Sequence, residues 1–277
     1  MPIWIFTRLT LNEALRNRLI PLAFGLTMVY IGLLAWGSSK IAENLRDPLQ
    51  SVISGAGLEQ AAFFLGSLML PLLAVFVPGH SVQQESENGL LQAILTKPVR
   101  RLDVVAGRWM GSAALLALWV ALFSAGVILP IGWEIGYYPP HPIRAGELLL
   151  LQGLVVLSLR LLFGSFLGTL ASGIVPLLIY GLGRIGGLVE AIGKALNISS
   201  MVNGGIATSL LIPTDVLWRG ASYYLLPELT GLASQAAGPN NPFVSLAPLA
   251  TPMLVWSVLY VVVIFFVGAR VFSLRDI

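Results

Sequence analysis

Six long apolar runs with few charged residues constrain this 277-residue chain more than any other feature. A helix needs roughly 17–25 apolar residues to cross a bilayer, and each run reaches that length. The runs are continuous rather than alternating, which favours helices over the strands of a barrel. They are expected near Leu19–Trp36, Ala61–Val77, Met110–Ile131, Leu148–Ala171, Ile174–Ile192 and Met253–Ala269. The sequence therefore predicts an all-α polytopic membrane protein with six transmembrane helices.

The composition supports a membrane protein and excludes several classes of chemistry. Charged residues make up only 10% of the chain, against roughly 25% in soluble domains, and the mean hydropathy is +0.85. The chain has no cysteine, so disulfides, thiolate catalysis and cysteine-ligated metals are absent. The net charge of only +3 gives no reason to expect nucleic acid as a partner. The expected surroundings are a lipid bilayer.

The Lys and Arg residues between the runs predict the orientation of the chain, because cytoplasmic loops carry an excess of both. With the N-terminus inside, nine of them fall on the cytoplasmic side and five on the outside. The cytoplasmic set is Arg8, Arg16, Arg18, Lys97, Arg100, Arg101, Arg108, Arg270 and Arg275. The outer set is Lys40, Arg46, Arg144, Lys194 and Arg219. Both termini are therefore predicted to be cytoplasmic, in a multi-pass protein of the cell (inner, cytoplasmic) membrane.

Two segments outside the six runs have their own predictions. Residues 1–18 are too polar to span and are expected to form an amphipathic helix at the cytoplasmic interface. Residues 193–251 are rich in Gly, Pro, Asn and Ser, and are expected to form an extracellular or re-entrant segment. Within it, the stretch that carries Asp215, Arg219 and Glu228 is predicted to be a helix on the outer surface.

Three ionisable residues fall within the predicted spans. Arg160 lies at the middle of the fourth, where an Arg costs at least about 2.5–3.5 kcal/mol on insertion scales and should face protein or water. It either hydrogen-bonds to backbone carbonyls or to neighbours such as Gln152 or Ser158, or it contacts a polar or anionic group along a substrate path. Arg184 and Glu190 are expected near the outer end of the fifth span, where water or lipid head groups solvate them.

Glycine pairs inside the spans are interpreted as packing motifs. Gly181-Leu-Gly183-Arg-Ile-Gly186 matches the dinucleotide fingerprint G-x-G-x-x-G, but that fingerprint needs a strand and a soluble βαβ unit around it. Small residues in a membrane helix instead let neighbouring helices approach closely. Gly107–Gly111 and Gly164–Gly168 have the same interpretation, at a helix–helix or dimer contact. The turn between the fourth and fifth spans is expected at Ala171–Gly173.

Seven charged residues gather in the 28 residues from Val82 to Trp109, between the second and third runs. Ser81 and Gln84 have the spacing of a capping box, which predicts that a helix starts there. Pro98 ends this helix at the residue before it. Glu87 lies on the apolar side of the helix. That apolar face consists of Leu90, Leu91, Ile94 and Leu95.

Periodicity alone leaves two interpretations of this segment open. In the first, residues 81–108 are a solvated loop whose helix rests on the lipid surface, with basic residues near anionic head groups. In the second, the helix inserts into a groove of a cytoplasmic ATPase and transmits its motion to the spans.

The same segment resembles the pattern after the second span in permeases of type-2 ABC exporters. That pattern reads roughly E-x-E-x-G-T-L, then L-x-[KR]-P-[VI]-[ST]-R, then G-K-[WF]. The matching residues are Glu85-Ser-Glu87-Asn-Gly89-Leu-Leu91, then Leu95-Thr-Lys97-Pro98-Val99 with Arg101, then Gly107-Arg108-Trp109. Leu90 and Arg100 depart from it, since the family often has Thr and a small hydroxyl residue there. The resemblance extends to the basic N-terminal helix, the six spans and the short C-terminal tail.

The resemblance implies a membrane subunit that works with a separate ATPase. Permeases of this group serve the export of antibiotics and lipids and the maturation of multicopper enzymes. Two permease copies, identical or related, would pair with two ATP-binding subunits, which bind ATP and Mg and drive substrate outward. This chain would itself bind no cofactor. The coupling role falls on Glu85, Glu87, Gly89, Leu91, Lys97, Pro98 and Arg101.

The functional prediction is the permease subunit of an ATP-binding cassette exporter, with residues 1–277 as one transmembrane domain. The sequence contains no G-x-x-x-x-G-K-[ST] phosphate loop, so ATP hydrolysis is expected on the partner and this chain is not expected to be an enzyme. One alternative is a non-transporting sensor, regulator or mechanotransmitter that docks the same kind of ATPase. Another is an intramembrane enzyme, which should show paired acidic, His or Ser residues within its spans, where only Arg160 is clearly expected to be buried.

Overall fold

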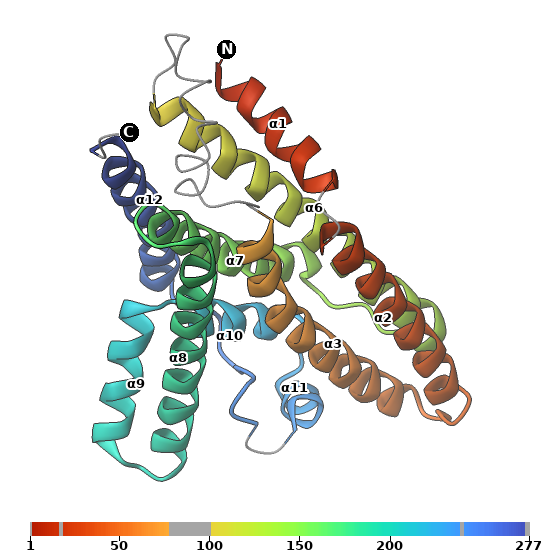
Figure 1. Cartoon of the computed structure of the whole chain (residues 1–277). Coiled ribbons are helices and arrows are strands. Elements are labelled where there is room, and N and C mark those ends of the chain that lie inside the picture. Colours follow the sequence, from red (N-terminus) through yellow and green to blue (C-terminus); the bar gives the residue numbers. More distant parts are fainter. Residues whose placement is uncertain (1, 17–18, 78–100, 239–240, 275–277) are drawn as a thin grey trace.

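A computed structural model describes residues 2–16, 19–77, 101–238 and 241–274, and within these residues it contains helices and turns but no strand (Figure 1). The helices are α1 (Pro2–Arg16), α2 (Leu19–Ala42), α3 (Pro48–Phe76), α6 (Arg101–Ile135), α7 (Pro142–Gly164), α8 (Thr169–Ala195), α9 (Ser199–Leu211), α10 (Thr214–Tyr224), α11 (Thr230–Ala237) and α12 (Thr251–Ser273). In the described part, six helices are long and apolar enough to cross a membrane, namely α2, α3, α6, α7, α8 and α12. The prediction of an all-α protein with six spans is confirmed.

The six long helices differ in how deeply they are buried within the chain. The most apolar stretches of α3 and α7 are 61% and 56% buried, whereas those of α2 and α12 are 11% and 22% buried. Side chains of α3, α6 and α7 interlock around Phe63, Leu70 and Phe123, which are fully buried. Gly153 of α7 allows the close approach, since a Cβ there would lie 3.0 Å from Leu70. The helices α3 and α7 therefore form the centre, while α2 and α12 present apolar surface to lipid.

The N-terminal helix α1 lies alongside the first half of α6, and α2 lies alongside the rest of it (Figure 1). The Thr7 hydroxyl donates to the carbonyl of Gly107 at 3.2 Å. A Cβ on Gly111 would lie 2.9 Å from Thr10, so a larger residue there would push the two helices apart. The interpretation of Gly107–Gly111 as a helix–helix contact is confirmed, and the partner is α1.

The break between the fourth and fifth spans lies earlier than the sequence suggested. The helix α7 ends at Gly164 and α8 begins at Thr169, so the turn expected at Ala171–Gly173 is wrong. Gly168 has an extended conformation with ψ of 162° and cannot continue the helix. Gly164 and Gly168 thus flank a turn instead of marking one helix face. Glycine costs helix stability wherever it occurs, whereas Pro176 is accommodated inside α8.

The segment after α8 forms three short helices. Figure 1 shows α9 folding back along α8, with α10 crossing next to α7 and α8. The expectation that α10 lies on the outer surface is wrong, because Leu217, Trp218 and Ala221 are fully buried. Pro213 separates α9 from α10, and both helices are too short to span a bilayer. The helix α10 is therefore part of the packed bundle.

Candidate functional site

Arg184, near the middle of α8, is enclosed by three aromatic rings and a carboxylate. Its guanidinium carbon lies 5.4 Å from the ring centroid of Phe64 and 5.5 Å from those of Tyr180 and Trp218. Its Nη1 lies 3.5 Å from Asp215 Oδ1, and its Nε donates to the Tyr180 hydroxyl at 2.9 Å. Aromatic faces and a carboxylate both attract a desolvated cation. Arg184 thereby connects α3, α8 and α10.

A second arginine, Arg219 of α10, joins two carboxylates. Its Nε lies 2.8 Å from Asp215 Oδ2, close enough for an ion pair but not aligned as a hydrogen bond. Its Nη2 donates to Glu190 Oε2 at 2.8 Å, and Glu190 also accepts from Lys194 at 2.6 Å. We call Arg184, Glu190, Asp215 and Arg219 the charge cluster. The side chains of these four residues are between 7% and 14% exposed.

The electrostatics of the charge cluster follow from burial and from its balance of signs. Burial raises the pKa of Asp215, while the positive charges of Arg219 and Arg184 act in the opposite direction. Two arginines face two carboxylates, so the four side chains carry no net charge when all are ionised. Removal of one member would leave its partner buried without compensation, which is the costly case for a buried ion pair.

Glycines of α8 make room for the charge cluster. A Cβ on Gly187 would collide with the Asp215 carboxylate, and one on Gly186 would collide with Thr208 of α9. A Cβ on Gly183 would lie 2.7 Å from the Thr214 hydroxyl. The structural interpretation of the G-x-G-x-x-G match is thus confirmed, since these small residues let α9 and α10 approach α8 closely. Gly181 differs, because a Cβ there would meet no atom of another described helix within 4 Å.

Further hydrogen bonds connect the charge cluster to α3 and α7. The Ser67 carbonyl accepts from the Tyr180 hydroxyl and from Gln152 Nε2, each at 2.9 Å. The Ser67 hydroxyl also accepts from Arg184 Nη2. Four helices therefore share one polar network in the middle of the bundle. In a membrane interior, such groups are expensive unless they satisfy one another.

The sequence predictions for the ionisable residues of this region were largely wrong. Arg184 and Glu190 were expected to be solvated near the outer end of α8, but both are buried and ion-paired. Asp215 and Arg219 were expected on an outer surface and instead complete the charge cluster. The sequence signal that could have found it was the run of close-packing glycines next to a charged residue in a span.

Arg160 lies near the end of α7 and is 4% exposed. Its Nε donates to the carbonyl of Val75 at 3.3 Å and its Nη1 to the Ser172 hydroxyl at 2.5 Å. The expected carbonyl partner is present, but Gln152 and Ser158 bond elsewhere. Val75 is two residues before the end of the described part of this region. Arg160 therefore fastens the end of α3 to the ends of α7 and α8.

The predicted coupling residues fall between α3 and the first residue of α6 in the sequence. Glu85, Glu87, Gly89, Leu91, Lys97 and Pro98 lie outside the described residues, as does the capping box that starts the predicted helix. Arg101 is the first residue of α6. The helix α3 precedes residues 78–100 in the sequence, and α6 follows them.

Glu59 of α3 is a buried ionisable residue that the sequence analysis missed. It is 0% exposed, and neither carboxyl oxygen has a hydrogen-bond partner among the described residues. The neighbouring Gln60 donates to the carbonyl of Ser222, and Gly55 packs directly on Tyr137. The expectation that only Arg160 is clearly buried is therefore wrong. Within the described residues, however, no group of three or more His, Cys, Asp or Glu side chains could hold a metal ion.

Comparison with known proteins relates the whole chain to membrane permeases. The chain is 25% identical over 273 residues to the probable ABC transporter permease protein NosY of Pseudomonas aeruginosa. The aligned region covers 92% of this chain and 91% of that protein. The chain is a homologue of ABC transporter permeases. The protein of the same name from Stutzerimonas stutzeri is 27% identical over 121 residues, or 43% of this chain and 42% of that protein. No known protein-family profile matches the chain.

The homology agrees with the six apolar helices, so the chain is a multi-pass permease subunit of an ABC system. The permease relatives suggest a non-enzymatic membrane subunit, and their names imply an ABC-type ATPase as partner. The permease has no disulfide, since it has no cysteine. The charge cluster lies in the middle of the bundle of this permease, and Arg160 lies at the end of α7 that holds the carbonyl of Val75.

Proposed function

We propose that this permease is the membrane subunit of an exporter, with all 277 residues acting as one transmembrane domain. A separate ATPase would bind ATP and Mg and supply the energy, and two permease copies would enclose the substrate path. The observation that carries the proposal is the relation to an ABC permease along 92% of the chain, together with the coupling-type motif at residues 85–101.

The helices on either side of residues 78–100 are connected to the rest of the bundle by contacts that could transmit force. A push on this segment would reach α3 and α6, the two helices to which it is joined. At the end of α3, Arg160 holds the Val75 carbonyl and Ser172, so movement of α3 would pull on α7 and α8. On the other side, α1 braces α6 through Thr7 and Gly107. The hydrogen bonds from Gln152 and Tyr180 to the Ser67 carbonyl would carry the movement to the middle of the bundle.

The proposal is tested by reversing charge within the motif. In Glu87→Lys and Lys97→Glu, the ABC-type ATPase partner should no longer co-purify with the permease, or should hydrolyse ATP without transport. Arg46→Glu, in the loop at the opposite end of the spans, is the matched control and should retain the ATPase. If both variants form the complex and transport normally, the coupling role of this segment is wrong.

Transport is distinguished from mere docking by a reconstituted complex. Purification with the ATPase, followed by mass spectrometry of retained small molecules, identifies candidate substrates. An exporter should hydrolyse ATP faster when its substrate is added on the ATPase side, and should accumulate that substrate on the other side. A complex that binds the ATPase yet moves none of the retained molecules would instead support a sensor or mechanotransmitter.

A further inference from the structure

Two cavities meet at Arg144, at the start of α7. The first has a volume of about 430 Å³ and is lined by Arg144, Glu147 and Tyr224, and by leucines of α7, of α12 and of the segment just before α12. The second, of about 420 Å³, lies beside it and shares Arg144 and Tyr224. Each volume falls within the range of small-molecule pockets, roughly 300–1,000 Å³. One cavity is mainly apolar and the other has a more polar lining, so together they match an amphipathic ligand.

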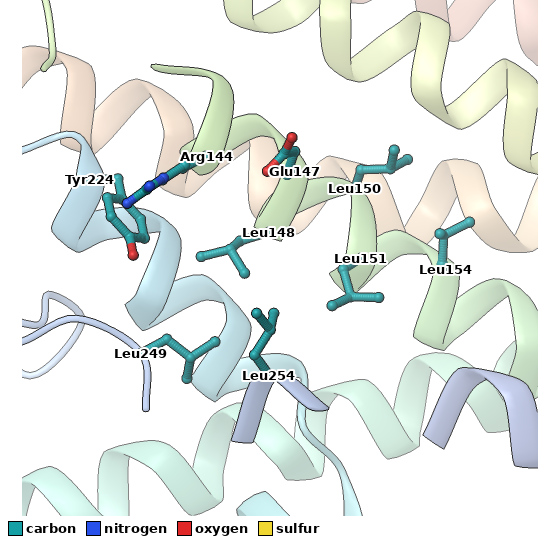
Figure 2. A pocket seen from close by; sticks show the side chains of 9 residues that line it. All are labelled: Arg144, Glu147, Leu148, Leu150, Leu151, Leu154, Tyr224, Leu249 and Leu254. Carbon is teal, nitrogen blue, oxygen red and sulfur yellow. The ribbon is translucent and has the colours of Figure 1, made fainter. Parts of the chain in front are cut away.

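The apolar cavity runs between α7 and the chain around α10 and α12. Figure 2 shows Leu148 and Leu151 of α7 pointing toward Leu249 and Leu254 across the cavity. Leu154 follows Arg144 by ten positions, which corresponds to about 15 Å along a helix. That length is about half of a hydrocarbon core of roughly 30 Å. The cavity therefore has the depth of one leaflet.

The Arg144 guanidinium is held against an aromatic ring, but no carboxylate of the described residues neutralises its charge. Arg144 lies over the ring of Tyr224, with 5.5 Å between its guanidinium carbon and the ring centroid, and His141 packs edge-on against the same ring at 5.8 Å. Among the described residues, no carboxylate forms an ion pair with Arg144, and Figure 2 shows the Arg144 side chain extending toward Tyr224 and away from Glu147. Arg184 and Arg219, by contrast, both contact carboxylates. The donors of Arg144 remain available to an anionic group.

The position of Arg144 matches the level of lipid head groups. The spans alternate in direction, so the start of α7 lies at the same end of the bundle as the α2–α3 loop and the start of α12. In the predicted orientation this is the outer leaflet. A cation at the interface, followed by an apolar cavity one leaflet deep, is complementary to a phospholipid.

We propose that this pair of cavities binds a phospholipid of the surrounding bilayer, with its phosphate at Arg144 and one acyl chain along Leu148, Leu151 and Leu254. The guanidinium of Arg144 and the phosphate form charge-assisted hydrogen bonds. The leucines enclose the acyl chain and separate it from neighbouring lipids. Bound there, the lipid fills the space between α7 and α12. The site is independent of ATPase coupling.

The test measures phospholipid retained by the full-length permease. Purified protein is delipidated in detergent, incubated with phosphatidylglycerol or with diacylglycerol of the same chains, and examined by native mass spectrometry. The wild type should retain phosphatidylglycerol and lose most of the diacylglycerol. Arg144→Gln should lower retention of phosphatidylglycerol about tenfold, the effect of one charge-assisted hydrogen-bonding group. Leu151→Trp, which fills the cavity, should lower it by a similar factor.

Two matched variants control for charge and bulk. Arg46→Gln removes an exposed cation at the same end of the bundle, and Leu259→Trp adds an indole to the lipid-facing surface of α12, away from the cavity. Both should retain phosphatidylglycerol like the wild type. Unchanged melting temperatures confirm that all four variants are folded. Equal retention by all variants, or equal loss in variants and controls, would overturn the site. Retention of diacylglycerol as strong as that of phosphatidylglycerol would overturn the assignment of phosphate to Arg144.

Discussion

Two buried arginines of this permease have their charge compensated by different kinds of partner. Arg184 is compensated by charge, because Asp215 lies 3.5 Å away and belongs to a cluster of two cations and two anions. Arg160 is held by neutral dipoles, namely the Val75 carbonyl and the Ser172 hydroxyl. The first arrangement is stable only when every member is present. The second fastens the ends of three helices without an ion pair, at the end of the bundle that leads into residues 78–100.

The largest expected effect comes from removing a carboxylate from the charge cluster. Asp215→Asn keeps the shape of the side chain but leaves Arg184 without a carboxylate and Arg219 with only Glu190. Because breaking a buried pair costs about 3–5 kcal/mol, the variant should unfold at a markedly lower temperature in detergent. Glu43→Gln is the control, since its pair with Lys40 is exposed and such pairs contribute about 0–1 kcal/mol.

A double-mutant cycle sharpens this expectation. If Arg184 and Asp215 stabilise each other, Arg184→Gln combined with Asp215→Asn should cost clearly less than the sum of the two single changes. Strictly additive losses in the thermal unfolding of the four proteins would contradict a direct interaction between the two side chains.

The next largest effect concerns the glycines that make room for the charge cluster. Gly187→Ala should destabilise the permease by about 1–3 kcal/mol, because its Cβ collides with the Asp215 carboxylate. Gly181→Ala lies on the same helix in open space, and should be neutral or stabilising by up to about 1 kcal/mol. Chemical or thermal unfolding of the two variants side by side measures the difference. Equal stabilities would show that α8 and α10 do not need this close contact.

The smallest effect on stability is expected at Arg160, where the consequence should be functional. Arg160→Met removes two hydrogen bonds but also a buried charge, so the net change in the free energy of unfolding should be about 1 kcal/mol. Transport by the complex should nevertheless fall, while the ATPase still co-purifies. Arg270→Met, at the exposed end of α12, is the control. Normal transport in Arg160→Met would exclude Arg160 from both force transmission and a substrate path.

The sequence predicted the fold class well, but it predicted poorly where α7 ends and which polar side chains are buried. The number and approximate position of the spans follow from apolar length, which is a local property of the chain. The boundary between α7 and α8 was wrong by several residues, because Gly168 and Pro176 give conflicting local signals and packing decides between them. The coupling residues from Glu85 to Pro98 remain a prediction from motif and resemblance.

Burial of polar groups was the harder question for sequence reasoning. Hydropathy treats Asp215 and Arg219 as surface residues, since a charged residue outside a span is usually solvated. Their burial depends on α10 packing against α7 and α8, and that contact depends on glycines that carry no charge signal themselves. Glu59 shows the same limit, because one acidic residue in an apolar run does not reveal whether it faces lipid, water or protein.

The sequence by itself determined that this chain is a membrane protein with six spans and that it lacks the phosphate loop of an ATPase. These properties follow from local composition and motifs. Only the tertiary structure decided which charges meet. Arg184 reaches Asp215 across 31 positions of the chain, and Arg219 reaches Glu190 across 29, through contacts that α8 permits only where it carries glycine. Pairing at that range depends on how helices fit together, so the glycines of α8 indicate close packing in the sequence but do not identify the partner of each charge.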